Sequence, residues 1–274
     1  MKLQLLTTAL LLIAFTFGSC KNERKLSNDE KEQIAADSSE VTVMTAIGEL
    51  TLPPPFATES VTKESKLIPW ENRMPKAPDG FTVTRFADNL DYPRWTYVAP
   101  NGDYFVVESN TKNSANRITL FRDTNGDGQP EVRETFMDNL NQPLGMLVLN
   151  NYFYVANTDG LYRYPYKEGA TKIDADGEKI VELSASGYNN HWTRNIISNK
   201  DGSKIYITVG SASNVGEQGM DKEEGRALIF EINPDGSGKR IYASGLRNPV
   251  GMDWNPVTGE LWTAVNERDK LGDG

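Results

Sequence analysis

The fold is decided by a repeated sequence motif, which first occurs as Leu90-Asp-Tyr-Pro93-Arg-Trp-Thr-Tyr-Val-Ala-Pro-Asn-Gly-Asp-Tyr-Phe-Val-Val107. In this motif a Leu or Tyr, two further residues and a Pro or His precede an apolar strand, a turn and a second apolar strand. The same layout returns in three later segments, which begin at Leu140, Tyr188 and Leu246. The Pro or His residues of the four segments lie roughly 50 residues apart, a spacing typical of repeat architectures.

Further strands are predicted between the repeats, at residues 117–122, 160–166 and 226–232. These segments are rich in β-branched and aromatic residues and are bounded by Asp, Asn and Gly turns. After the N-terminal leader, no stretch of the sequence shows a sustained helical period. Short strands with this repeat length predict an all-β fold, a β-propeller, with an irregular β-sandwich as the alternative.

The repeats occupy residues 78–274 and provide about four blades. The fourth repeat has its first two strands, after which the sequence stops. A propeller closes on itself because closure removes the exposed edges of its sheets. We therefore expect this sequence to be a C-terminally truncated part of a longer protein, and a closed four-bladed ring is the alternative.

The N-terminus predicts export from the cytoplasm. A short positive start precedes a mostly apolar run at Leu3–Phe17, which is shorter than the roughly 20 residues of a membrane span and has the layout of a secretory signal. Small residues then lead directly into Cys20, and this arrangement resembles the lipobox of bacterial lipoproteins. We predict a signal peptide over residues 1–19 and lipidation of Cys20, with an ordinary signal peptide and an incidental cysteine as the alternative.

Residues 20–77 are predicted to be a lipid-anchored flexible tether. Lys, Glu, Asp, Ser and Asn dominate the first part of this segment, and such a composition has little to bury. Residues 78–274 then form the incomplete propeller domain. We expect an exported bacterial lipoprotein that is anchored to the membrane, such as the outer membrane, on its periplasmic or cell-surface side.

The composition excludes several classes of site. The chain has 29 Lys and Arg against 38 Asp and Glu, for a net charge of −9. This acidic surplus argues against nucleic-acid binding and against attachment to anionic lipid by charge, so the membrane is expected to be reached through the N-terminal lipid only. A single cysteine excludes an internal disulfide and a cysteine-based metal site. His191 is the single histidine, so any histidine chemistry must use it.

Candidate functional residues precede the first strand of each repeat. In a propeller that strand is the candidate inner strand of its blade, and the residues before it lie at one mouth of the central channel. The aligned positions hold Asp91-Tyr92, Asn141-Gln142, Asn189-Asn190 and Arg247-Asn248. Polar side chains from several blades therefore converge on one funnel, the default place for a binding site. His191 replaces the proline of its repeat, and we predict a functional histidine over a surface or packing histidine.

Four motifs carry a resemblance to a known family, namely His191-Trp-Thr-Arg194, Val209-Gly-Ser-Ala-Ser-Asn214, Gly245-Leu-Arg-Asn-Pro-Val-Gly251 and Asn266-Glu-Arg-Asp269-Lys-Leu-Gly-Asp273. They resemble the motifs of sorbosone dehydrogenase-type proteins, which are relatives of soluble quinoprotein glucose dehydrogenase. The resemblance covers residues 78–274 and implies a six-bladed propeller that holds pyrroloquinoline quinone (PQQ) and calcium in its funnel. It also implies oxidation of a sugar or sugar-derived aldehyde or alcohol, with electrons passed to a separate acceptor, a cytochrome or a quinone.

The resemblance assigns roles to individual residues. His191 would be the catalytic base that takes the hydroxyl proton while hydride passes to the quinone. Imidazole suits this task because its usual pKa of about 6.5 lies near the working pH. Arg247 and Asn248 would hold carboxylates and carbonyls of the quinone, since arginine matches a carboxylate with two parallel N–H donors. The remaining cofactor-binding candidates are Gln142, Asn190 and Arg194.

Two stretches are candidates for calcium. The resemblance places backbone carbonyls of Asp269 and Lys270 at the activating ion, which would polarise the quinone carbonyl as a Lewis acid. The second stretch, residues 123–134, spaces oxygen-bearing side chains and glycine as an EF-hand loop does. Its oxygen ligands would stand at positions 1, 3, 5, 9 and 12 of the loop, namely Asp123, Asn125, Asp127, Glu131 and Glu134. Because this stretch lies between strands, a plain hairpin turn rich in Asp, Asn and Gly is an equal alternative to a structural calcium loop.

The favoured function is that of a quinoprotein sugar or sorbosone dehydrogenase-like oxidoreductase that depends on PQQ and calcium. A calcium-dependent lactonase on a similar propeller is one alternative, but that class surrounds its calcium with Asp, Glu and Asn side chains. The mouth positions here mix Arg, Asn, Gln and His, which favours an anionic cofactor. A non-catalytic propeller that binds a glycan or protein at the cell surface is the other alternative, because propellers serve many functions.

Overall fold

The computed structural model of the chain describes residues 27–37, 40–45, 48–52, 66, 68–69, 71, 73–111, 114–267 and 269. The predicted signal peptide, Cys20 and Lys270 lie outside these residues. The chain divides into two compact units, of which one is Met1–Lys63 with Lys270–Gly274 and the other is Glu64–Asp269. The predicted domain boundaries at residues 19 and 77 stay predictions.

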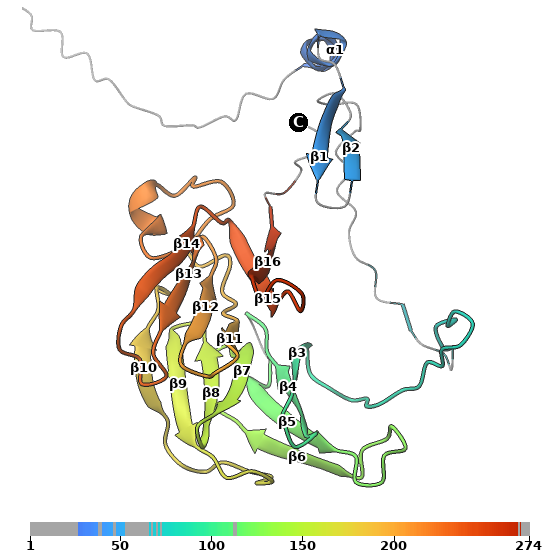
Figure 1. The fold of residues 1–274 in the computed structure, drawn as a ribbon, viewed down its shortest axis with the longest axis vertical. Coiled ribbons are helices and arrows are strands. Elements are labelled where there is room, and N and C mark those ends of the chain that lie inside the picture. Colours follow the sequence, from blue (N-terminus) through green and yellow to red (C-terminus); the bar gives the residue numbers. More distant parts are fainter. Residues whose placement is uncertain are drawn as a thin grey trace, which may run out of the picture. The chain divides into compact units, whose positions relative to one another are not determined.

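The smaller unit contains one α-helix and one β-hairpin among its described residues (Figure 1). These elements are α1 (Asn28–Asp37), β1 (Val41–Thr45) and β2 (Gly48–Leu52). The helix starts with a reciprocal cap, because the Glu30 backbone N–H donates to Ser27 Oγ and the Ser27 backbone N–H donates to the Glu30 carboxylate. Part of the predicted tether thus has regular secondary structure. Within the described residues, no helix has the length and apolar character that crossing a membrane requires.

The larger unit consists of consecutive antiparallel sheets that follow one another in chain order (Figure 1). The first sheet contains β3 (Pro93–Val98), β4 (Tyr104–Glu108), β5 (Arg117–Arg122) and β6 (Val132–Met137). The second contains β7 (Gly145–Leu149), β8 (Tyr152–Asn157), β9 (Gly160–Pro165) and β10 (Glu178–Glu182). The third contains β11 (Ile196–Ser198), β12 (Ile205–Val209), β13 (Leu228–Ile232) and β14 (Arg240–Ser244). The fourth contains β15 (Asn248–Trp254) and β16 (Leu261–Asn266).

Each sheet is a meander in which every strand pairs with the next one along the chain. The first strands of the sheets contact one another in sequence, β3 with β7, β7 with β11 and β11 with β15. This is the arrangement of propeller blades around a shared axis, with the first strand of each repeat innermost. The predicted all-β propeller of about four blades is confirmed, and the fourth repeat supplies two strands.

The core lies between neighbouring blades, because the central strands of the second and third sheets bury both of their faces. Every residue of β12 is buried, which explains why this strand is a continuous apolar run instead of an alternating one. Between the first and second blades, the ring of Phe105 lies 4.6 Å from that of Phe136 and 4.9 Å from that of Phe153. Aromatic pairs of this kind contribute roughly 0.5–1.5 kcal/mol each beyond their buried area.

Hydrogen bonds between blades fix the spacing of the inner strands. The backbone N–H of Gly145 on β7 donates to the Arg194 carbonyl next to β11 at 2.9 Å. A Cβ atom on Gly145 would stand 2.7 Å from the backbone nitrogen of Ile196, so only glycine permits this approach. The Trp254 ring N–H on β15 donates to the Ser198 carbonyl on β11 at 2.8 Å. The residues before each inner strand are therefore held at one mouth of the propeller.

Candidate active site

The candidate site forms where three chain segments of the third and fourth blades meet. One segment precedes β11 and carries His191, one follows β12 and carries Gly210, and one begins β15 with Asn248. A Cβ atom on Gly210 would stand 2.5 Å from Asn248 Oδ1 and 2.6 Å from the Cβ atom of His191. Glycine at this position therefore allows the two side chains to approach each other.

His191 is buried, and its ring nitrogens have different neighbours. Nδ1 lies 2.9 Å from the carbonyl oxygen of Ser211 and 2.9 Å from the Ser211 hydroxyl oxygen. A carbonyl oxygen can only accept, so Nδ1 carries the proton and Nε2 keeps its lone pair. Nε2 lies 3.4 Å from the side-chain nitrogen of Asn190. The structure thus presents the basic nitrogen of the imidazole next to Asn190.

The surroundings of His191 keep its imidazole neutral at neutral pH. Burial lowers the pKa of His191, and the charge of Arg247 lowers it further. The Ser211 carbonyl, Asp269 and Glu223 act in the opposite direction, and the net result is a pKa below the usual value. A neutral imidazole with a free lone pair can accept a proton from a substrate.

Asn248 has an unsatisfied polar atom in this buried place. Its Oδ1 has no hydrogen-bond partner among the described residues, and the residue is only 9% exposed. Leaving a buried acceptor unpaired costs roughly 1–3 kcal/mol. A bound molecule with a hydrogen-bond donor would relieve this cost.

Arg247 organises the chain around the site. Its Nε donates to the Asn214 carbonyl at 2.8 Å, and its Nη1 donates to the carbonyls of Asn266 and Glu267 at 2.9 and 2.6 Å. Its Nη2 donates to the Asn214 side-chain oxygen. Of the five N–H groups of a guanidinium, four are thus engaged within the chain. The predicted two-pronged hold on a carboxylate needs two free donors, whereas this arrangement leaves one.

The structure corrects the prediction that Arg194 contacts a cofactor. Arg194 is fully buried, and its Nη1 donates to the carbonyls of His191 at 2.7 Å and Thr193 at 2.9 Å. Its Nη2 donates to the Ser184 carbonyl at 2.8 Å. Burial, with a smaller effect of the nearby Arg226 charge, lowers the pKa of Arg194 to about 9. Arg194 therefore holds the turn that carries His191 and does not reach the mouth.

Gln142 lines a cavity beside the segment that carries His191. The cavity has a volume of about 840 Å³, and Asn189 and Trp192 on either side of the His191 segment also line it. Gln142 adopts φ 49°, a left-handed conformation that is strained for a residue before proline. Its side-chain nitrogen donates to the Asn110 carbonyl at 3.3 Å. The structure brings Asn190 to His191 and places Gln142 beside this cavity.

Asp269 is the described member of the predicted activating calcium stretch, and it is exposed. Its backbone N–H donates to the Asn214 side-chain oxygen at 3.2 Å, the same oxygen that accepts from Arg247. Asn214 therefore links the end of the fourth blade to the loop after β12. Lys270, the other member of this stretch, lies outside the described residues.

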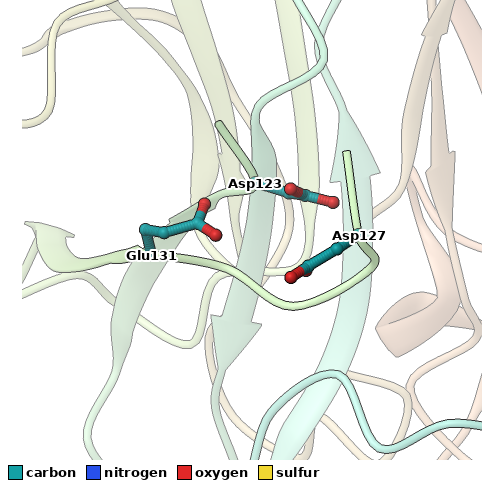
Figure 2. A group of neighbouring side chains, drawn as sticks. All are labelled: Asp123, Asp127 and Glu131. Carbon is teal, nitrogen blue, oxygen red and sulfur yellow. The ribbon is translucent and has the colours of Figure 1, made fainter. Parts of the chain in front are cut away.

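The predicted calcium loop is a hairpin turn between β5 and β6, and three of its four predicted acidic side chains gather there. The carboxylates of Asp123, Asp127 and Glu131 lie within 4.8 Å of one another (Figure 2). Glu134 is not among them, because β6 begins at Val132 and places Glu134 opposite Leu120 on β5. The chain continues as a strand here, whereas an EF-hand loop would enter a helix.

Hydrogen bonds inside this turn account for its acidic residues. The two carboxylate oxygens of Asp123 accept the backbone N–H groups of Gly126 at 2.7 Å and Gly128 at 2.8 Å. The Asn125 side-chain nitrogen donates to Glu131 at 2.5 Å. These contacts are those of the hairpin-turn alternative. The three gathered carboxylates are also oxygen donors of the kind that calcium prefers.

Two residues at the site were not predicted from the sequence. Ser211 contacts His191 directly, and Glu223 binds the backbone that follows Ser211. Ser211 belongs to the sequence motif Val209–Asn214, and this motif could have marked Ser211 as a site residue. Glu223 lies in an acidic loop with no such signal.

Fold and site together define a β-propeller with a buried, neutral histidine among polar groups at its mouth. The chain belongs to the TrAA12-like family, whose sequence profile matches residues 75–273. This agrees with the resemblance to PQQ-dependent sugar dehydrogenases at the level of the family.

Two curated relatives each match 72% of this chain. A protein of Hypocrea jecorina named pyrroloquinoline quinone-dependent sugar dehydrogenase is 23% identical over 211 residues, which cover 72% of this chain and 48% of the relative. An uncharacterized protein of Borreliella burgdorferi is 28% identical over 207 residues, which cover 72% of this chain and 51% of the relative. The chain thus spans about half the length of the curated relatives it matches.

Solved structures share the fold. The holo PQQ domain of pyranose dehydrogenase from Coprinopsis cinerea superposes with a TM-score of 0.58 at 19% identity, over 71% of this chain and 48% of that chain. An iodide structure of a family AA12 enzyme from Trichoderma reesei gives a TM-score of 0.60 at 18% identity, over 75% and 53% of the two chains. At these identities the likeness shows the fold alone.

Proposed function

We propose that this chain contributes the catalytic base of a PQQ-dependent dehydrogenase that oxidises a sugar or a sugar-derived aldehyde or alcohol of the sorbosone or aldose type. The observation that carries the proposal is the contact of His191 Nδ1 with the Ser211 carbonyl, 2.9 Å long, which keeps the proton on Nδ1 and leaves Nε2 as the basic nitrogen. Membership in the TrAA12-like family and the curated relative named a PQQ-dependent sugar dehydrogenase support the choice of cofactor and substrate class.

The residues around His191 fit an anionic, planar quinone. Asn248 Oδ1 is buried and lacks a donor among the described residues, and PQQ has a ring N–H that could supply one. Gly210 has no Cβ, so Asn248 and His191 can both pack against its backbone. Arg247 retains one N–H group and its positive charge for a carboxylate of the cofactor. Asn248 and Arg247 would therefore hold the quinone.

When bound, the quinone would accept a hydride from the substrate carbon. His191 Nε2 would take the hydroxyl proton of the same carbon, so that an alcohol loses a hydride and a proton and becomes a carbonyl. The Ser211 carbonyl keeps the proton on Nδ1 and so keeps Nε2 basic. The Asn190 amide, 3.4 Å from Nε2, would orient the substrate hydroxyl beside it.

The described residues do not make a complete calcium site next to this base. Calcium takes about six to eight oxygen ligands, and the described part of its predicted stretch is Asp269. The nearby carbonyls of Asn266 and Glu267 already accept N–H groups of Arg247. Activation by calcium is therefore implied by the family resemblance alone.

We further propose that the protein is exported and anchored through lipid on Cys20, and that a cytochrome or quinone takes the electrons. The apolar leader and the position of Cys20 support the anchor. Metabolic labelling with a fatty acid tests it, because label should be lost in a Cys20→Ser variant.

The test of the activity is dye reduction by the protein with and without added PQQ, against a panel of aldoses and sugar aldehydes. We expect PQQ-dependent turnover that falls about 10²- to 10⁴-fold in His191→Ala, the usual contribution of a general base. Quinone absorbance should remain with the variant through gel filtration. A protein that neither turns over nor retains quinone would overturn the proposal and favour a surface-binding propeller.

A further inference from the structure

We propose that Glu223 is a positioning residue for His191, which it controls through the backbone of Ser211 and Ala212. Glu223 ends the short 3₁₀ helix η1 (Met220–Glu223) in the loop between β12 and β13. The inference rests on the proposed role of His191 as the base and adds the group that holds its imidazole in the reactive form.

The carboxylate of Glu223 gathers three donors from two consecutive residues. Oε2 accepts the Ala212 backbone N–H at 2.7 Å. Oε1 accepts the Ser213 backbone N–H at 3.2 Å and the Ser213 hydroxyl at 2.7 Å. Hydrogen bonds to a charged acceptor are stronger than those between neutral groups, so this one side chain fixes the conformation of the segment that follows β12.

The pinned segment includes the peptide group that contacts the histidine. The carbonyl of Ser211 and the N–H of Ala212 belong to one peptide unit, which is planar and rigid. His191 Nδ1 lies against the carbonyl end of this unit, and Glu223 accepts from its N–H end. Glu223 therefore sets the direction in which the carbonyl points. A carboxylate on the N–H also polarises the carbonyl and makes it a better acceptor for the imidazole proton.

The second acceptor of the imidazole depends on the same segment. The Ser211 hydroxyl oxygen lies 2.9 Å from His191 Nδ1 and donates its own proton to the Ser213 carbonyl at 2.7 Å. Ser213 in turn donates its backbone N–H and its hydroxyl to Glu223. The carboxylate of Glu223 therefore positions both oxygen atoms that accept the Nδ1 proton, the carbonyl and the hydroxyl of Ser211.

Glu223 differs from the acidic residue that follows it. Glu223 is half-buried and faces the segment after β12, whereas Glu224 is exposed. Asp221 is also exposed and pairs with Lys222 at 2.8 Å. A change at Glu224 removes the same charge from the same loop and leaves the contacts of Ala212 and Ser213 intact. Glu224→Gln is therefore the matched control for Glu223→Gln.

The test uses the full chain with ¹⁵N-labelled histidine and no added quinone. His191 is the only histidine, so a long-range ¹H–¹⁵N spectrum reports one imidazole and distinguishes a protonated Nδ1 from a protonated Nε2. We expect the Nδ1–H form to dominate in the unaltered chain and in Glu224→Gln. In Glu223→Gln the ratio of the two forms should move by about fivefold or more toward Nε2–H, the change that loss of one typical hydrogen bond produces.

Ser213→Ala provides a milder version of the same test, since it removes one of the three donors to Glu223. It should shift the ratio of the two imidazole forms in the same direction by a smaller amount. If circular dichroism shows that Glu223→Gln does not fold, Ser213→Ala becomes the test of the proposal. An unaltered ratio in the folded Glu223→Gln variant, or in Ser213→Ala in its place, overturns the proposal.

This experiment separates the positioning role from the proposed activity. The imidazole spectrum needs neither quinone nor substrate, so a chain without dehydrogenase activity can still show the shift. In an active protein, Glu223→Gln should lower kcat by the same factor by which it lowers the Nδ1–H population, with little change in KM, since a proton on Nε2 removes the base without removing a substrate contact.

Discussion

The imidazole Nδ1 of His191 lies 2.9 Å from the carbonyl oxygen of Ser211. These residues stand in different segments, one before the inner strand β11 and one after its neighbour β12. Because the carbonyl has no proton to give, the contact selects one of the two neutral forms of the imidazole. The single histidine of the chain is thereby held as a base with its reactive nitrogen next to Asn190.

The pH dependence of this base follows from its surroundings. Burial and Arg247 lower the pKa of His191 in the folded protein, so Nε2 should stay unprotonated below the usual value of about 6.5. The acid limb of kcat/KM for sugar oxidation should have its midpoint below about 6.5. NMR titration of the one imidazole measures the same pKa directly, and a midpoint above the usual value would contradict the assignment.

Stability should depend on the same titration. The unfolded chain binds a proton at His191 more readily than the folded chain does, because the folded-state pKa is the lower of the two. The free energy of unfolding should therefore fall as the pH drops from about 6.5 to the folded-state pKa. Urea unfolding across this window should show a weaker pH dependence in His191→Gln than in the unaltered protein.

Gly210→Ala should disrupt the site by overpacking. The new methyl would stand 2.5 Å from Asn248 Oδ1 and 2.6 Å from the Cβ atom of His191, so one of the two must move. We expect a loss of about 1–3 kcal/mol in the free energy of unfolding, together with a loss of PQQ-dependent turnover. Gly251→Ala is the control, since its Cβ would come no closer than 3.3 Å to another atom, the Cβ of Ala264. An equal loss in that control would show that crowding at Gly210 is not the cause.

Asn248→Leu should weaken quinone binding and stabilise the quinone-free protein. Removing a buried oxygen without a partner among the described residues should raise the free energy of unfolding of the quinone-free protein by about 1 kcal/mol. Quinone affinity should fall about tenfold or more if this oxygen accepts a donor of the cofactor. Thermal unfolding and absorbance titration measure the two effects, and unaltered quinone affinity would remove Asn248 from the binding site.

Arg194→Lys should destabilise the His191 turn although it keeps the charge. A lysine ammonium cannot reach in one plane the carbonyls of His191, Thr193 and Ser184 that the guanidinium binds. Leaving one or two of these buried carbonyls unpaired should cost roughly 2–4 kcal/mol in the free energy of unfolding. Arg85→Lys at an exposed site should cost little, and a similarly small effect at Arg194 would refute the turn-holding role.

The sequence by itself determined the propeller and the histidine at its mouth. Strand, turn and strand recur about every 50 residues, and this local pattern is readable in the sequence because each blade is built from neighbouring residues. His191 could be singled out because it interrupts its own repeat and has no competitor of its type. The group of acids at residues 123–134 shows the limit of spacing rules, since Asp123, Asp127 and Glu131 gather as the spacing predicts, whereas Glu134 lies in β6, where the chain continues as a strand.

The tertiary structure alone decided how the site is held together. The hydrogen-bond partners of His191, Arg194 and Arg247 are mostly backbone carbonyls. Every residue has such a carbonyl, so the sequence cannot show which ones take part. Arg194 belongs to the same motif as His191, yet packing between blades buries it and turns its donors inward. Glu223 reaches His191 through one rigid peptide unit, and no spacing rule connects residues whose contact depends on how a loop folds back over its blade.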